Sequence, residues 1–302
     1  MAQTGLADAL LADALGRIAH DIDAKFDALL PLPADPRSRL VEAMRYAAIG
    51  GGKRLRPLLL TATAEMYGVD RDTAVRAGAA VEAIHVYSLI HDDLPCMDDD
   101  ALRHGKPTLH CAFDEATAVL AGDALHDLAF EILSDVVTSG DPFTRIELVS
   151  ALAAASGAQG MAGGQMMDML AQDEPFDLFT VTRLQQLKTG ALLAVSVEMG
   201  AILGKVPPDG RTHLRGYARD IGLAFQIADD LIDYEGDEAA AGKALRKDSG
   251  AGKQTFVSLL GPERARAQAR MLLDQAVAHL VQHGAEAELL RALARYIVER
   301  DR

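Results

Sequence analysis

The chain has 302 residues, of which 49% are hydrophobic and 25% are charged, and its formal net charge is −14. Nucleic acids and anionic membrane surfaces require a basic face on the protein, so this charge argues against both as partners. The 2 cysteines are too few for a disulfide framework or a cysteine zinc site, which fits a reducing compartment. No linker or low-complexity block interrupts the sequence, so we expect a single domain over residues 1–302.

The N-terminal segment does not resemble a signal peptide, because its first basic residue is Arg17 and several aspartates precede residue 30. No apolar run approaches the roughly 20 residues that span a bilayer. We therefore expect no membrane span and a cytoplasmic protein.

Apolar residues recur at helical spacing along most of the chain. A helix capped by Asp72 is expected to run into an acidic segment at residue 92, and other helices are expected over residues 6–26, 36–48, 58–66, 114–137, 145–170, 177–203, 213–234, 262–280 and 285–298. No run alternates with a period of two, so no strands are expected. The predicted fold class is all-α, a bundle of roughly ten helices with the active site in a central cavity between them.

Two aspartate-rich segments each follow an apolar helical run. They read Asp92-Asp93-Leu94-Pro95-Cys96-Met97-Asp98 and Asp229-Asp230-Leu231-Ile232-Asp233. Carboxylates this close repel one another, so we expect a cation between them. Oxygen ligands without histidine or cysteine at ligand spacing favour Mg²⁺ or Mn²⁺ over zinc, and Mg²⁺ often completes its shell with substrate phosphate. A solvated acidic loop would explain one segment alone, but two favour a shared diphosphate site.

The spacing within each segment sets its geometry. Asp229 and Asp233 are four positions apart and share a helix face, whereas Asp92 and Asp98 would diverge on a straight helix. Pro95 disfavours a continued helix, so the chain can turn there and bring Asp98 back beside Asp92.

A diphosphate also needs cationic partners. The candidates are Lys53 and Arg56 after three glycines, then Arg103, Lys188, Lys243 and Lys253. Each of them alone would more often be a surface charge. His85 lies seven positions before Asp92 on the same helix face, where the alternative is an ordinary core histidine. Tyr87 and Ser88, five and four positions before Asp92, could set the depth of an apolar pocket or simply pack in the core.

Together these residues resemble the short-chain trans-isoprenyl diphosphate synthases, most closely the bacterial members that form farnesyl diphosphate. The two acidic segments look like the two aspartate-rich motifs of that family. Further similar segments follow in the family's order over nearly the whole chain: Gly51-Gly52-Lys53-Arg54-Leu55-Arg56-Pro57, Gly163-Gly164-Gln165-Met166-Met167-Asp168, Lys188-Thr189, Phe225-Gln226 and Gly252-Lys253.

The resemblance implies a role for each candidate residue. It implies three Mg²⁺ ions, which Mn²⁺ can replace, held by the motifs that contain Asp92, Asp93, Asp98, Asp229 and Asp233. The allylic diphosphate would be bound by Arg103, Lys188, Lys243 and Lys253, with Thr189 and Gln226 steadying the allylic carbocation. Isopentenyl diphosphate would be bound by Lys53, Arg56, His85 and His104. Tyr87 and Ser88 would limit the product to fifteen carbons, and the protein would be a homodimer.

The implied reaction condenses isopentenyl diphosphate with dimethylallyl or geranyl diphosphate after metal-assisted ionisation of the allylic substrate. Three positions depart from the family pattern, and one of them is Ala101, where an acidic residue is common. His104 stands where a second arginine is usual and lacks its bidentate fork and most of its charge, so we expect a raised KM for isopentenyl diphosphate. Arg246 stands where glycine is common.

Other functions remain open from the sequence. A geranyl or geranylgeranyl diphosphate synthase would differ only in product length. A terpene cyclase would lack the isopentenyl diphosphate site. The dipeptide His91-Asp92 suggests a metal phosphohydrolase, but no separate histidine cluster supplies the other ligands. A non-catalytic subunit would be expected to have lost aspartates.

Overall fold

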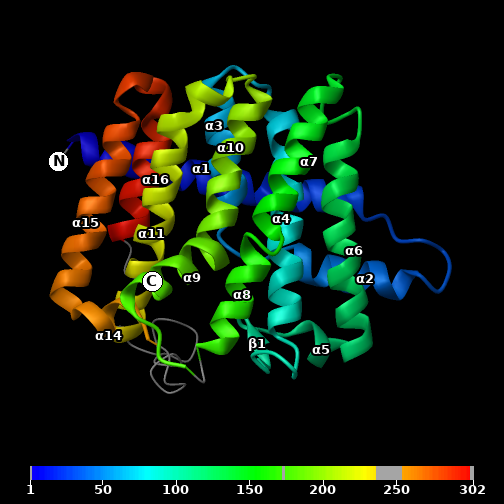
Figure 1. Cartoon of the computed structure of the whole chain (residues 1–302). Coiled ribbons are helices and arrows are strands. Elements are labelled where there is room, and N and C mark those ends of the chain that lie inside the picture. Colours follow the sequence, from blue (N-terminus) through cyan, green and yellow to red (C-terminus); the bar gives the residue numbers. More distant parts are fainter. Residues whose placement is uncertain (1, 172–173, 236–253, 300–302) are drawn as a thin grey trace.

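The computed structural model describes residues 2–171, 174–235 and 254–299, and most of these residues are helical (Figure 1). The main helices are α1 (Ala2–Leu29), α2 (Ser38–Ala48), α3 (Leu55–Met66), α4 (Arg71–Asp92), α6 (Glu115–Ser134), α7 (Pro142–Ser156), α8 (Met161–Leu170), α9 (Leu178–Gln185), α10 (Ala191–Leu203), α11 (Thr212–Glu235), α15 (Pro262–His279) and α16 (Glu288–Glu299). A π-helix, Gln186–Gly190, joins α9 to α10, and α5 (Leu109–Ala112) and α14 (Phe256–Leu260) are short. The predicted all-α fold class is confirmed.

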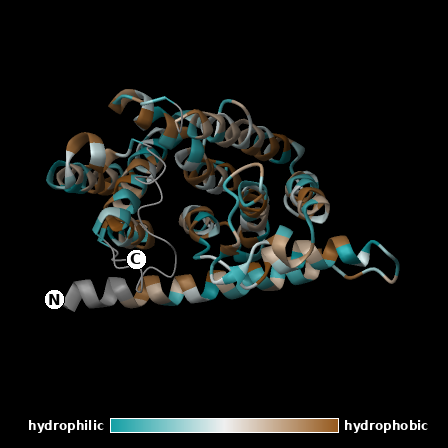
Figure 2. Ribbon diagram, turned by 90° about the horizontal axis from the view of Figure 1, so that it is seen from below, coloured by the Kyte–Doolittle hydropathy of each residue, from teal (hydrophilic) through white to brown (hydrophobic). Residues whose placement is uncertain are grey.

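The bundle is built around α4 and α10. Nearly every residue of α4 from 74 to 86 is buried, and α10 is buried over most of its length. A helix that is apolar all round must be covered on all sides. Accordingly, α4 packs against α3, α6 and α10, while α10 also packs against α7 and α11. In Figure 2 most helices are seen end-on, and α1 lies across one side of them.

Three local predictions were wrong. The cap of α4 is Asp70, whose carboxylate accepts hydrogen bonds from the backbone N–H groups of Asp72 and Thr73. Residues 145–170 form two helices, α7 and α8, because residues 157–160 include two glycines, which disfavour a continuous helix. Two strands, β1 (Leu102–Arg103) and β2 (Lys106–Pro107), pair as an antiparallel hairpin, which is too short to show an alternating pattern.

The stretch Leu178–Leu203 is long and apolar enough, by length and composition, to cross a membrane. The expectation that no apolar run approaches about 20 residues is therefore wrong for this stretch. The stretch comprises α9, the π-helix and α10, and α10 packs against α3, α4, α7 and α11. Its apolar character is accounted for by its place in the centre of the bundle.

Candidate active site

Both acidic segments lie at the same end of the bundle. The carboxyl ends of α4 and α11 both point to the lower end in Figure 1, and α8, α9 and the π-helix lie between them. Contacts link the two sides: the charges of Asp92 and Asp98 act on Lys188 of the π-helix, and Gln226 of α11 contacts Gln185 just before that helix. The two acidic segments therefore lie at one end of the bundle and are linked through the π-helix and Gln185.

The chain turns back after Asp92, the last residue of α4. The backbone N–H of Asp98 donates to the carbonyl of Asp92 at 2.8 Å, so the turn at Pro95 brings Asp98 beside Asp92 as predicted. Burial raises the pKa of Asp92 to about 6, and the charges of Asp98 and Asp168 add to this effect while Lys188 and Arg103 oppose it. The carboxyl group of Asp92 thus lies where a cation would be stabilised.

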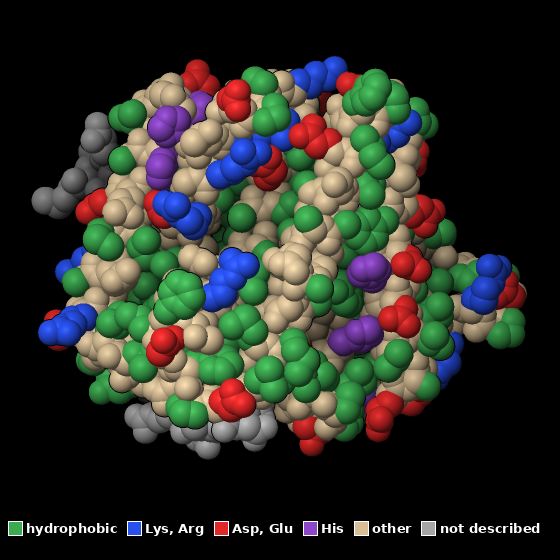
Figure 3. All heavy atoms as spheres, viewed as in Figure 1, with side chains coloured by type: hydrophobic (Ala, Val, Ile, Leu, Met, Phe, Trp, Pro, Cys, Tyr) green, Lys and Arg blue, Asp and Glu red, His purple; other side chains and the backbone are tan. Residues whose placement is uncertain are grey.

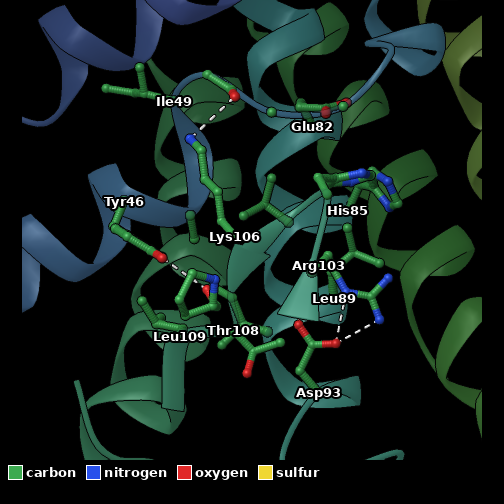
Figure 4. Close-up of a pocket in the computed structure, with 18 of the residues that line it drawn as sticks. Tyr46, Ile49, Glu82, His85, Leu89, Asp93, Arg103, Lys106, Thr108 and Leu109 are labelled. Carbon is green, nitrogen blue, oxygen red and sulfur yellow. Dashed lines mark hydrogen bonds and ion pairs between the residues drawn. The ribbon is translucent and has the colours of Figure 1, made fainter. Parts of the chain in front are cut away.

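Asp93 faces a different partner. Its side chain is buried, and its Oδ1 accepts from Arg103 Nε at 2.7 Å and lies 2.6 Å from Arg103 Nη2 (Figure 4). Burial raises the pKa of Asp93, and the hydrogen bond from Arg103 opposes that rise. Asp93 therefore fixes the guanidinium of Arg103 at the start of the hairpin.

The hairpin also places His104. His104 and Gly105 occupy the turn with φ of 50° and 76°, the backbone shape that a two-residue hairpin loop prefers. The turn is held at its base, where the Tyr46 hydroxyl donates to the Pro107 carbonyl at 2.9 Å (Figure 4). Burial and the neighbouring charge of Arg103 lower the pKa of His104, so its imidazole is neutral near pH 7.

Lys188 is presented by the π-helix, a rare element that often occurs at functional sites. Its Nζ lies 2.8 Å from Oδ2 of Asp168 on α8. Burial favours a lower pKa for Lys188, but Asp168, Asp92 and Asp98 outweigh it and raise the pKa above its ordinary value. Lys188 is therefore a fixed positive charge. Asp168 falls in one of the family-like segments, but its role could not be predicted, because its partner Lys188 lies 20 residues away in the sequence.

Gln226 and the second acidic segment lie on α11. Gln226 Nε2 donates to Gln185 Oε1 at 2.7 Å, a contact that the sequence did not suggest. Asp230 is buried and accepts from the backbone N–H of Phe256 at 2.7 Å, so it anchors α14. Asp229 and Asp233 are half-buried one turn apart. Lys243, Lys253 and Arg246 lie outside the described residues, within which no three histidine, cysteine or acidic side chains form a ready-made metal cluster.

A pocket lies along the part of α4 that carries His85, and it is bounded by α2, residues 49–54 and the hairpin (Figure 4). His85, Arg103 and His104 line it, whereas Lys53 and Arg56 lie outside its lining. Burial, followed by the charges of Arg56, Arg103 and Arg54, holds the pKa of His85 well below its usual range. Arg56 Nε is buried without a hydrogen-bond partner among the described residues. Arg54, Arg56 and Arg103 thus bring positive charge to the surroundings of His85, where an anion would be stabilised.

Tyr87 lies on α4, five residues before Asp92. Its half-buried ring meets His91 and His126 edge-on, with centroids 5.7 Å and 5.1 Å away. Burial and the charge of Asp92 raise the pKa of Tyr87. Ser88 turns to the backbone instead, because its hydroxyl donates to the carbonyl of His85 at 2.8 Å.

The comparison with known proteins assigns this helical bundle and its charged site to the trans-prenyltransferases. The polyprenyl synthetase model matches residues 37–296, and the chain belongs to this family. It is 46% identical over 292 residues to the farnesyl diphosphate synthase of Escherichia coli, covering 94% of this chain and 96% of that protein. It is 44% identical over 287 residues to the chloroplastic geranylgeranyl pyrophosphate synthase 11 of Arabidopsis thaliana, covering 93% and 80%.

Solved structures agree with this assignment. An apo FPP/GFPP synthase from Zymomonas mobilis is 59% identical, with a TM-score of 0.89 and coverage of 96% of this chain and 99% of that one. A geranyltransferase from Helicobacter pylori, complexed with magnesium and isoprenyl diphosphate, is 33% identical, with a TM-score of 0.80 and coverage of 95% and 98%.

Proposed function

We propose that the protein condenses isopentenyl diphosphate with dimethylallyl diphosphate and then geranyl diphosphate to give (2E,6E)-farnesyl diphosphate and diphosphate. The observation that carries this proposal is the pairing of an acidic site around Asp92 with arginine charges around the neighbouring His85, where Arg56 Nε has no hydrogen-bond partner among the described residues. A terpene cyclase ionises one diphosphate substrate and has no use for a second anion site. The similarity to farnesyl diphosphate synthases supports the same conclusion.

The donor groups fit Mg²⁺. Asp92 is a partly buried carboxylate whose pKa burial raises to about 6, even though Lys188 and Arg103 oppose the rise. The other proposed ligands, Asp98 and Asp229, are also hard oxygen donors. We propose three Mg²⁺ ions, replaceable by Mn²⁺, with Asp93 and Asp233 in the same motifs. When bound, Mg²⁺ would neutralise charge on the departing diphosphate.

The side chains around the acidic site would act by position and charge. Lys188, fixed by Asp168, and Arg103, fixed by Asp93, are proposed to bind the allylic diphosphate as its charge develops. Lys243 and Lys253 are proposed to join them. Thr189 and Gln226 would direct their dipoles at the allylic cation in a site that excludes water.

The second substrate would bind in the surroundings of His85. Lys53 and Arg56 would hold the diphosphate of isopentenyl diphosphate, and neutral His85 would donate a hydrogen bond. His104 is proposed to complete the site as a weaker donor than arginine. No protein base is required, because the released diphosphate can take the proton that is lost on condensation.

The fifteen-carbon product is proposed from Tyr87, whose ring is backed by two histidines and would stop a growing chain. A geranylgeranyl product is the second candidate, because relatives of similar identity carry that name. A geranyl product would require a side chain that stops the growing prenyl chain at ten carbons.

The assembly is also a proposal. Large apolar side chains are exposed in the turn before α7 and on α7: Val136, Val137, Phe143 and Ile146. Figure 3 shows hydrophobic side chains at the upper right, where this part of the chain lies. Such a patch is suited to a second copy of the chain in a homodimer. We also infer that residues 1–302 act as one domain, because one core cluster joins residues from Leu11 to Ile297. A cytoplasmic location is inferred from the relatedness to bacterial farnesyl diphosphate synthases.

The test is a product assay. Purified protein, Mg²⁺ and labelled isopentenyl diphosphate are incubated with dimethylallyl or geranyl diphosphate, and the prenyl chains are identified after dephosphorylation. We expect a fifteen-carbon chain that disappears with a metal chelator. A twenty-carbon chain would replace the farnesyl assignment with the geranylgeranyl one. No incorporation with either primer would refute the proposed function.

A further inference from the structure

Arg54 differs from the basic residues beside it. Lys53 is exposed, but the Arg54 side chain enters the core and only 4% of the residue is exposed. Arg54 also precedes α3 as its N-cap, with a φ of 51°. Residues other than glycine rarely adopt this backbone shape, and it persists only where the surroundings hold it.

The guanidinium of Arg54 connects the start of α3 to three other helices, α1, α2 and α4. Nη1 donates to Glu82 Oε1 on α4 at 2.8 Å, and Nη2 donates to Asp23 Oδ1 on α1 at 2.8 Å. Nη2 also donates to the Ala48 carbonyl at the end of α2, at 2.6 Å. The second oxygen of Asp23 accepts the backbone N–H of Gly50 at 3.1 Å. We refer to Asp23, Ala48, Gly50, Arg54 and Glu82 as the Arg54 network.

The Arg54 network fixes residues 50–52, which have no side chains to pack against the rest of the protein. Residues 50–52 are all glycine, with φ of 76° and 75° at Gly50 and Gly52, so they have no side chains to pack. Beyond the network, Lys106 Nζ reaches the Gly50 carbonyl at 3.4 Å (Figure 4). Without Arg54, little would fix the path of the chain between α2 and α3.

We propose that Arg54 and Glu82 are positioning residues for isopentenyl diphosphate. Lys53 and Arg56 flank Arg54 in the sequence, and His85 follows Glu82 by one turn of α4. The Arg54–Glu82 pair therefore ties the segment that carries two of the proposed ligands to the helix that carries the third. This inference rests on the proposed function, since it uses the proposed isopentenyl diphosphate site.

The charge distribution fits this role. Glu82 is buried between two arginines, because Oε1 binds Arg54 and its charge also acts on Arg56. Glu82 Oε2 and Arg56 Nε are buried, and neither has a hydrogen-bond partner among the described residues. Arg54 donates directly to Glu82, so Arg56 Nε is left to donate to an anion. A buried ion pair often adds little net stability, so stability alone does not explain the Arg54–Glu82 pair.

The test compares KM values for the two substrates in Arg54→Lys and Glu82→Gln. A misplaced binding segment should raise the KM for isopentenyl diphosphate by roughly 10- to 100-fold. The KM for geranyl diphosphate should stay within about twofold, because the allylic groups belong to other elements. Binding of isopentenyl diphosphate beside a non-ionising thio analogue of geranyl diphosphate, followed by calorimetry, should weaken by the same factor.

Arg211, which directly precedes α11 and lies far from the proposed substrate sites in the sequence, provides a matched control. Arg211 is also 4% exposed, and it binds Glu147, Glu198 and the Val206 carbonyl. Arg211→Lys should lower the Tm without changing either KM. An equal rise in both KM values for Arg54→Lys, or an unchanged KM for isopentenyl diphosphate, would overturn the inference.

The double variant Arg54→Met/Glu82→Leu guards against loss of folding. Replacing a buried ion pair with apolar residues can leave stability unchanged, so this variant should fold and still show the raised KM. A return to the wild-type KM would mean that the pair serves stability only and would overturn the inference. Failure of the wild-type enzyme to use isopentenyl diphosphate would instead refute the proposed function, and the inference with it.

Discussion

Gly164 is the point where α8 comes closest to the π-helix that carries Lys188. A Cβ at position 164 would lie 2.1 Å from the Lys188 backbone nitrogen and 2.6 Å from its Cα, whereas ordinary contact begins at 3.4 Å. Both obstructing atoms belong to the backbone, so no rotamer change can relieve the clash. In Gly164→Ala the two segments must separate by about 1.3 Å, the difference between 3.4 and 2.1 Å.

This separation would disturb the Lys188–Asp168 pair. Asp168 lies one helical turn after Gly164, and its Oδ2 is now 2.8 Å from Lys188 Nζ. Separation by that amount would stretch the contact towards the limit of an ion pair. We expect kcat to fall roughly 10- to 100-fold, because a displacement of about 1 Å costs this much in a positioned charge. Overpacking should lower the free energy of unfolding by about 1–3 kcal/mol.

The assay is kcat at saturating concentrations of both substrates, together with thermal unfolding. Gly16→Ala is the control, because Gly16 is exposed on α1 and no described atom lies within 4 Å of its added Cβ. That variant should keep the wild-type kcat and gain up to about 1 kcal/mol of stability. A kcat within twofold of wild type for Gly164→Ala would refute the argument that α8 positions Lys188.

Three further predictions concern single side chains. Tyr87→Ala should release longer prenyl diphosphates, seen by chromatography of the dephosphorylated products, because the ring that would stop the chain is gone. His104→Arg should lower the KM for isopentenyl diphosphate roughly tenfold, since it adds a charged hydrogen bond worth about 1.5 kcal/mol. Asp92→Asn should raise the Tm of the metal-free protein clearly more at pH 8 than at pH 4.5. Burial raises the pKa of Asp92 from 3.8 to about 6, so the folded state binds a proton there more tightly than the unfolded chain, and ionisation above pH 6 costs up to about 3 kcal/mol.

Each of these predictions has its own control. Tyr87→Phe keeps the ring and should keep the product, and an unchanged product from Tyr87→Ala would rule out the chain-length role. His104→Gln stays uncharged and should not lower the KM; equal KM values for wild type and His104→Arg would contradict the assigned role. Mg²⁺ should raise the Tm of wild type more than that of Asp92→Asn at pH 8. Equal shifts would count against Asp92 as a ligand.

The sequence predicted what depends on neighbours along the chain. Helical periodicity gave the all-α class and most of the helices, because a buried helix must repeat its apolar residues every turn. Pro95 predicted the return of Asp98 to Asp92, since a proline restricts the residue before it. The resemblance supplied the family, which the comparison with known proteins confirmed.

What only the tertiary structure decided is which charged groups meet. Asp93 pairs with Arg103, Asp168 with Lys188, and Arg54 with Glu82. No local rule selects these partners, because ion pairs depend on distance in space and on burial, and each of these pairs joins different elements. The sequence by itself therefore determined the helices and the types of residue available for catalysis. The packing of α4, α8 and the π-helix determined which charges are neutralised within the protein and which remain available to a substrate.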